Sequence, residues 1–186
     1  MSVEAPVVTT AERAEMERAN RAWLERALLA NETVLETGPY EAHVGFSNVC
    51  NMSCIMCWNG ANPPAQRMDP RTMERFAEQI APLLSIITPY NGSEPLIVTW
   101  DETRRICERY GIELCLTTNV QFLDERKFEE LEGITETLFL SVDSHIPEVF
   151  ELIRPRSRPA RVFANLRTTA ALARNVPFTC STRSWG

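Results

Sequence analysis

The sequence YEAHVGFSNVCNMSCIMC, residues 40–57, joins a strand pattern directly to a cluster of cysteines. Apolar residues alternate with more polar ones from residue 40 to residue 47, which is the period-two pattern of a β-strand. Three of the chain's six cysteines then follow within eight residues, as Cys50, Cys54 and Cys57. Their spacing is C-x3-C-x2-C, and no fourth cysteine completes the loop. So many thiols in one short loop predict a site for chemistry.

Strand and helix patterns alternate along the rest of the chain. Asp69 and Pro70 are typical of a helix start, and Gly111 is typical of a helix end. We expect strands at 40–46, 85–88, 112–118, 137–142 and 176–182, and helices at 10–37, 68–84, 101–111 (capped by Asp101), 124–131 and 158–175. Strands that are separated by helices pair in parallel through right-handed crossovers. The predicted fold class is therefore α/β, with about five strands.

The composition describes an ordinary globular chain of 186 residues with a net charge of −6. The chain is acidic and contains no run of basic residues that could bind a phosphate backbone, so no nucleic-acid partner is expected. No apolar run approaches the roughly 20 residues of a membrane span, and the N-terminus lacks a signal-peptide pattern. We expect a cytoplasmic protein with a helical extension at 1–38 and one domain at 39–186.

Three clustered cysteines have few explanations in a chain with reduced thiols. A structural zinc ion normally takes four protein ligands, and disulfides need cysteines in pairs. Three thiolates suit a [4Fe-4S] cluster in which the fourth iron stays open to an exogenous ligand. A zinc module that takes its fourth ligand from elsewhere is a less favoured alternative. The other cysteines, at positions 107, 115 and 180, are expected to pack as small apolar residues.

The motif and its place after the first strand resemble the radical S-adenosylmethionine (SAM) family, and the resemblance runs from about residue 40 to residue 181. It implies a partial (β/α) barrel of parallel strands and a [4Fe-4S] cluster held by the three cysteines. It also implies that SAM is cleaved reductively into methionine and a 5′-deoxyadenosyl radical that abstracts hydrogen from a substrate. The electron would come from a donor such as flavodoxin or ferredoxin. The substrate, a small molecule or a peptide, is not identified by the sequence.

Two loops after the predicted strands resemble parts of the family's SAM site. The segment NGSEP, residues 91–95, is similar to the Gly-Gly-Glu motif, which makes Glu94 the candidate acceptor for the SAM ammonium and Gly92 the point of close backbone approach. Asn119 ends the third strand, where it could face SAM or the substrate. A plain surface turn is the alternative for both segments.

The end of the fourth predicted strand, FLSVDS, resembles the family strand that contacts SAM. Ser141 is the first candidate there and Asp143 the second. The following ELIRP segment nominates Arg154 for the SAM carboxylate, because a guanidinium can grip a carboxylate through two hydrogen bonds. A simple salt bridge is an equal alternative for this arginine.

The sequence departs from the family pattern at three points. Met56 stands where an aromatic residue is usual before the third cysteine, and Ser93 replaces the second glycine of the Gly-Gly-Glu motif. The patterns stop at about the fifth strand, whereas the family core has six. We therefore expect a barrel that is incomplete at its C-terminal end. The second hypothesis for function is a truncated, non-catalytic iron-sulfur-binding fragment that needs a partner chain.

Overall fold

The computed structural model describes residues 10–35, 37–59, 63–90 and 92–183. The first nine residues of the predicted extension and the last three residues of the chain lie outside this part. Five parallel strands form one sheet in the order β1-β2-β3-β4-β5. They are β1 (Glu41–His43), β2 (Ile86–Thr88), β3 (Glu113–Thr118), β4 (Thr135–Ser141) and β5 (Thr179–Arg183). The predicted α/β class with five parallel strands is confirmed.

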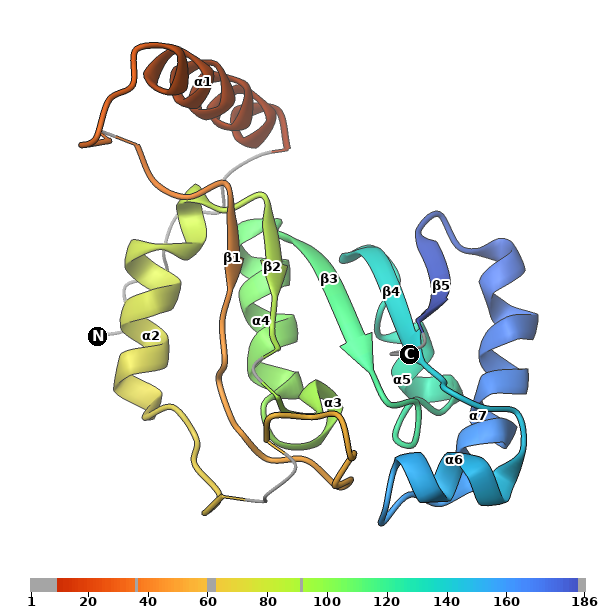
Figure 1. Ribbon diagram of the computed structural model, residues 1–186. Coiled ribbons are helices and arrows are strands. Elements are labelled where there is room, and N and C mark those ends of the chain that lie inside the picture. The colour runs from red at the N-terminus through yellow and green to blue at the C-terminus, as the bar shows by residue number, and fades with distance from the viewer. Residues whose placement is uncertain (1–9, 36, 60–62, 91, 184–186) are drawn as a thin grey trace, which may run out of the picture.

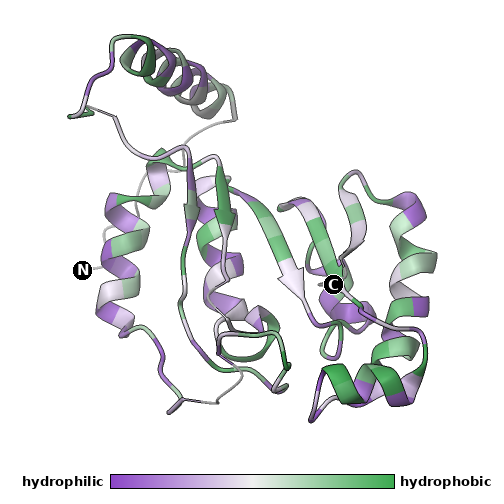
Figure 2. Cartoon of the chain, in the orientation of Figure 1, coloured by the Kyte–Doolittle hydropathy of each residue, from purple (hydrophilic) through white to green (hydrophobic). Residues whose placement is uncertain are grey.

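Side chains from the central strands make the core of the sheet. Ile87, Leu114, Leu116 and Leu138 are fully buried, which explains why these strands read as apolar runs in the sequence. Figure 2 shows apolar residues along β2, β3 and β4. Because the strands follow their order in the sequence, each crossover leads to the next strand, and the sheet curves as an open barrel with helices outside it (Figure 1).

The helices begin and end close to the predicted positions. Asp69 accepts a hydrogen bond from Thr72 N at 3.0 Å and caps α2, as expected. Gly111 ends α4 in the left-handed conformation, with φ 63°. The predicted cap at Asp101 is wrong, since α4 begins at Trp100 and Asp101 lies in its first turn. The helices after β1 are α2 (Pro70–Gln79), α3 (Pro95–Val98), α4 (Trp100–Tyr110), α5 (Glu125–Glu129), α6 (Pro147–Ile153) and α7 (Pro159–Leu172), with 3-10 turns η1 (Ala81–Leu83) and η2 (Ala173–Asn175).

The first helix, α1 (Thr10–Leu29), is shorter than the predicted 10–37. It ends in a Schellman motif: Glu32 N donates to Ala27 O at 3.0 Å, Asn31 N donates to Leu28 O at 3.2 Å, and Asn31 has φ 53°. The helix lies at the amino ends of β1 and β2, away from the loops that follow the strands (Figure 1). No helix in the described part of the chain could span a membrane.

The loops that leave the carboxyl ends of the strands gather at one end of the molecule. Figure 1 shows the long loop after β1 beneath the loops that follow β2, β3 and β4. Ligands of parallel α/β proteins bind at this edge, because the strands deliver side chains and loop backbone from several segments to one place. The cysteine loop, residues 50–57, therefore lies where a site is expected.

Candidate functional site

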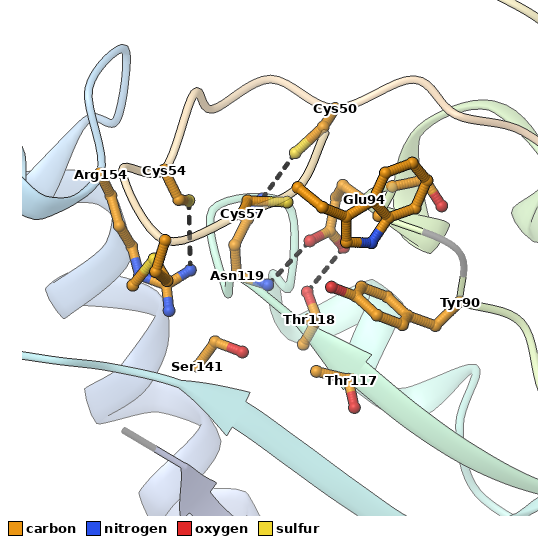
Figure 3. A pocket seen from close by; sticks show the side chains of 14 residues that line it. Cys50, Cys54, Cys57, Tyr90, Glu94, Thr117, Thr118, Asn119, Ser141 and Arg154 are labelled. Carbon is orange, nitrogen blue, oxygen red and sulfur yellow. Dashed lines mark hydrogen bonds between the residues drawn. The ribbon is translucent and has the colours of Figure 1, made fainter. Parts of the chain in front are cut away.

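A cavity of about 310 Å³ opens at the carboxyl ends of the strands. Its wall combines the cysteine loop, the loop after β2, the ends of β3 and β4, and the end of α6 (Figure 3). The lining residues are Cys50, Cys54, Met56, Cys57, Trp58, Tyr90, Gly92, Ser93, Glu94, Thr117, Thr118, Asn119, Ser141 and Arg154. The volume is in the range of small-molecule sites.

Backbone hydrogen bonds attach the cysteine loop to the segment after α6. Ser53 N donates to Pro155 O at 2.9 Å, and Ile55 N donates to Ile153 O at 3.0 Å. A further bond of 3.0 Å, from Cys57 N to Cys54 O, closes a turn within the loop. The loop is thus held by the main chain, so the cysteine side chains are left to face the cavity.

The three cysteines, predicted as metal ligands, all line this cavity. Burial raises the pKa of Cys50 to about 11 and also raises the pKa of Cys54, where the Arg154 guanidinium opposes the effect. Thiols in such surroundings stay protonated unless a cation binds them, because a metal deprotonates its thiol ligands. Within the described ranges, no three His, Cys, Asp or Glu side chains are arranged around a point that would hold a single ion.

Hydrogen-bond donors point at two of the cysteine sulfurs. Arg154 Nη1 lies 3.6 Å from Cys54 Sγ, and Asn119 Nδ2 lies 3.9 Å from Cys50 Sγ (Figure 3). Asn51 Nδ2 is buried beside them and has no acceptor among the described residues. Thiolates with N–H donors around them are the ordinary surroundings of an iron-sulfur cluster, in which each cysteine binds a different iron. The residues present therefore fit the predicted [4Fe-4S] cluster.

Glu94 contributes a buried carboxylate to the cavity wall. Thr118 Oγ1 and Asn119 N each donate to it at 2.7 Å, and Leu96 N donates at 3.4 Å. The residue is 3 % exposed, and burial raises its pKa to about 7. These three hydrogen-bond donors are all neutral, so no positive charge of the described residues is in hydrogen-bond contact with the carboxylate. A cationic group in the cavity would meet a fixed acceptor.

Gly92 lines the cavity and has a left-handed backbone, with φ 69°. A Cβ at this position would lie 2.8 Å from the Trp58 ring and 2.9 Å from Asn59 Cβ. Asn59 Nδ2 also donates to Gly92 O at 2.7 Å. The glycine therefore lets the loop after β2 pack against the end of the cysteine loop. The sequence had suggested close approach to a ligand, and the close approach seen here is to Trp58.

The remaining predicted residues lie at the ends of β4 and α6. Ser141 is buried and lines the cavity, whereas Asp143 is absent from the described lining. The Asp143 carboxylate instead accepts a hydrogen bond from Arg154 Nε in an ion pair whose side chains are 5 % and 6 % exposed. Arg154 is thus both a cavity residue, as expected, and a partner of Asp143.

Sequence reasoning missed several residues of the cavity wall, among them Trp58, Tyr90, Thr117 and Thr118. Tyr90 lies two residues after β2, and burial raises the pKa of its phenol. The two threonines end β3. A rule that inspects the last residues of every predicted parallel strand would have found the threonines, and extending it two residues beyond each strand would have found Tyr90. Trp58 has no such signal beyond its place next to the third cysteine.

Solved structures with this fold include three proteins that carry bound ligands. SuiB of Streptococcus suis matches with S-adenosylmethionine bound (TM-score 0.63, 20% identity, 90% of this chain and 38% of that chain) and with the precursor peptide SuiA bound (0.62, 20%, 99% and 40%). The protein anSMEcpe with bound AdoMet, which is S-adenosylmethionine, matches with TM-score 0.59, 19% identity and coverage of 77% and 43%. BtrN in complex with AdoMet and 2-DOIA matches with TM-score 0.51, 16% identity and coverage of 77% and 56%.

These similarities establish the fold, and the chain spans between 38% and 56% of the length of these structures. No curated protein matches the sequence significantly. The model of the Radical SAM superfamily matches residues 44–184, which include the cysteine loop and all strands from β2 onward. The chain therefore belongs to the radical SAM superfamily.

Proposed function

We propose that this chain is a radical SAM enzyme that holds a [4Fe-4S] cluster on Cys50, Cys54 and Cys57. The observation that carries the proposal is that one cavity is lined by all three cysteines and by the buried Glu94 and Arg154. When bound, the cluster and SAM supply reductive cleavage of the SAM sulfonium and a 5′-deoxyadenosyl radical for hydrogen abstraction. The protein binds and orients SAM and keeps water out of the site.

The cavity offers a complementary group for each part of SAM. We assign the SAM ammonium to Glu94, whose carboxylate is held in place by Thr118 and Asn119. The carboxylate of SAM is assigned to the guanidinium of Arg154, through N–H groups beyond those used by Asp143 and Cys54.

Smaller polar groups and aromatic side chains complete the proposed SAM site. Ser141 and the Asn119 amide would contact the ribose or the methionine part, and Gly92 would present its backbone. Trp58, Tyr90 and Met56 give the cavity apolar surfaces that suit the face of a purine. Asp143 contributes to this site by fixing Arg154.

The substrate is proposed as an organic molecule with an abstractable hydrogen, either a small molecule or a peptide. Both kinds occur in the matched structures, since SuiB carries a precursor peptide and BtrN carries 2-DOIA. We propose that a flavodoxin or a ferredoxin donates the electron, and that the protein works in the cytoplasm, where cysteines stay reduced.

Anaerobic reconstitution tests the proposed function. The purified chain is supplied with iron and sulfide, reduced with dithionite and given SAM, and 5′-deoxyadenosine is measured by chromatography. We expect about four irons per chain and SAM-dependent formation of 5′-deoxyadenosine, because the three cysteines line one cavity. Bound zinc without iron would contradict the cluster, and a cluster without 5′-deoxyadenosine would support the non-catalytic alternative.

Two alanine variants provide a matched comparison for this experiment. Cys54→Ala removes a ligand from the cavity and should abolish both the cluster and the product. Cys180→Ala removes a half-buried cysteine of β5 that does not line the cavity within the described part of the chain, and it should keep both. Equal iron content in the two variants would overturn the assignment of the cysteine loop.

A further inference from the structure

Arg154 has two contacts whose charges oppose each other. Its Nη1 donates to Cys54 Sγ at 3.6 Å, and its Nε donates to the Asp143 carboxylate. The arginine is 5 % exposed, so both contacts lie in surroundings where charges are poorly screened. The planar guanidinium holds the positive charge at a fixed position against the sulfur, since the pair with Asp143 leaves it little rotational freedom. A buried charge next to a cluster ligand acts directly on the cluster's electrons.

Two asparagines extend this arrangement to the neighbouring cysteine. Asn119 Nδ2 lies 3.9 Å from Cys50 Sγ, and the same nitrogen donates to Asn51 Oδ1 at 2.9 Å. This bond fixes the Asn51 amide, whose own Nδ2 is buried without an acceptor in the described chain. A buried N–H group without an acceptor is costly, and the sulfur atoms of a bound cluster would supply acceptors for such groups.

We propose that Arg154, Asn119 and Asn51 raise the reduction potential of the cluster. Arg154 makes the largest contribution, and the negative charge of Asp143 partly cancels it. This inference rests on the proposed cluster. The step concerned is a one-electron reduction of the cluster from its +2 to its +1 state, with the electron supplied by an external low-potential reductant. The added negative charge spreads onto the thiolate sulfurs, so positive charge and N–H donors at those sulfurs stabilise the reduced state.

The proposal predicts opposite shifts of the reduction potential for changes at Arg154 and at Asp143. Removing Arg154 deletes the positive charge and the N–H donor at Cys54, which disfavours reduction and lowers the potential. Removing the charge of Asp143 deletes a negative charge that partly cancels Arg154, which favours reduction and raises the potential. A merely structural pair would not shift the potential in opposite directions, because damage at either residue would loosen the same loop.

The test is a redox titration of the reconstituted full chain with SAM left out, followed by electron paramagnetic resonance of the +1 state. Arg154→Met should lower the midpoint potential, Asp143→Asn should raise it, and Asn119→Leu should lower it by less than Arg154→Met. Arg174→Met, at an exposed arginine of η2 outside the cavity, is the matched control and should leave the potential unchanged. Circular dichroism and iron content verify that each variant is folded and loaded.

The outcomes separate this inference from the proposed function. If the unmodified chain forms no cluster, the proposed function itself fails. If it forms a cluster and the Arg154 and Asp143 variants shift the potential in the same direction or leave it unchanged, the potential-setting role is wrong and the enzyme proposal stands. Should Arg154→Met fail to hold a cluster, a raised potential in Asp143→Asn together with a lowered one in Asn119→Leu supports the inference, and any other combination overturns it.

Discussion

The two buried charged side chains of the cavity, Glu94 and Arg154, are held in contrasting ways. Glu94 accepts hydrogen bonds from Thr118, Asn119 and Leu96, all of them neutral groups. Arg154 is paired with the carboxylate of Asp143. The carboxylate of Glu94 is fixed in position and feels the Arg154 guanidinium only at a distance, whereas Arg154 has its countercharge in direct contact.

The two residues therefore differ in how much they contribute to ligand binding and to the stability of the fold. Burial raises the pKa of the Glu94 carboxylate, and a positively charged ligand in contact with it would stabilise its ionised form. A buried ion pair carries its own countercharge, so breaking it mainly destabilises the fold around the cavity. We therefore expect changes at Glu94 to affect mainly ligand binding and pH dependence, and changes at Arg154 to affect the stability of the fold in addition to the binding of SAM.

The largest expected effect comes from breaking the ion pair. Arg154→Met should lower the free energy of unfolding by about 3–5 kcal/mol, because it removes the guanidinium that pairs with the buried Asp143 carboxylate. Urea denaturation of the metal-free protein measures the loss. The double variant Arg154→Met with Asp143→Leu should recover most of it, since no unpaired charge remains. A double variant as unstable as the single one would show that the arginine acts through packing instead.

The second effect is a pH dependence that belongs to Glu94. Its pKa in the folded protein is about 7 against 4.5 for the free side chain, so its contribution to stability is complete below pH 4.5 and is lost as the pH rises through 7. Between pH 4 and pH 8, the wild type should lose up to about 3 kcal/mol relative to Glu94→Gln. Urea denaturation across this range checks the difference. Parallel curves for the two proteins would mean that folding does not shift the pKa of Glu94 from the value of the free side chain.

The third effect concerns ligand affinity. Glu94→Gln should weaken SAM binding to the reconstituted protein by about 10- to 100-fold, because a hydrogen bond to a charged group contributes about 1.5–3 kcal/mol. The wild-type affinity should also rise with pH through about 7, where the carboxylate ionises. Isothermal titration calorimetry measures both. Glu132→Gln, at an exposed glutamate, is the control, and equal weakening in the two variants would refute the assignment of the ammonium.

The smallest effect is the difference between two glycine variants, and it tests how the loop after β2 packs against Trp58. Gly92→Ala should cost about 1–3 kcal/mol for the left-handed backbone alone, and more for the contact with Trp58 at 2.8 Å. Gly133→Ala is a close control, since Gly133 also has positive φ, 77°, and open space around it. Thermal unfolding compares the two variants. Equal losses would show that the approach to Trp58 is unimportant.

The sequence predicted the sheet and the main residues of the cavity because their signals are local. The apolar runs of β3 and β4, the cap at Asp69 and the spacing of the cysteines are each contained within a few residues. Two short helices, α3 with four residues and α6 with seven, were missed. A helix of one or two turns is too short to establish a 3.6-residue period, and its stability comes from tertiary packing.

Partnerships across the chain could not be predicted in the same way. Asp143 was expected at the ligand, yet it lies against Arg154, eleven residues further along the chain. The carboxylate satisfies the arginine because the turn after β4 and the end of α6 bring the two together, a geometry with no periodic signature. The early end of α1 did have a local signal in Asn31, since asparagine tolerates the left-handed position of a Schellman motif.

The main chain of Asn119 contacts one wall of the cavity, at Glu94, and its side chain contacts another, at the cysteine loop. Its N–H holds the Glu94 carboxylate at 2.7 Å, while its amide reaches toward Cys50 and Asn51. A shift of this residue that improves one contact changes the other, so the two walls share a coupling free energy. Coupling between two binding events is reciprocal. If a group bound at the cysteines changes the affinity of Glu94 for a cation, the cation changes the affinity of the cysteines for that group by the same factor.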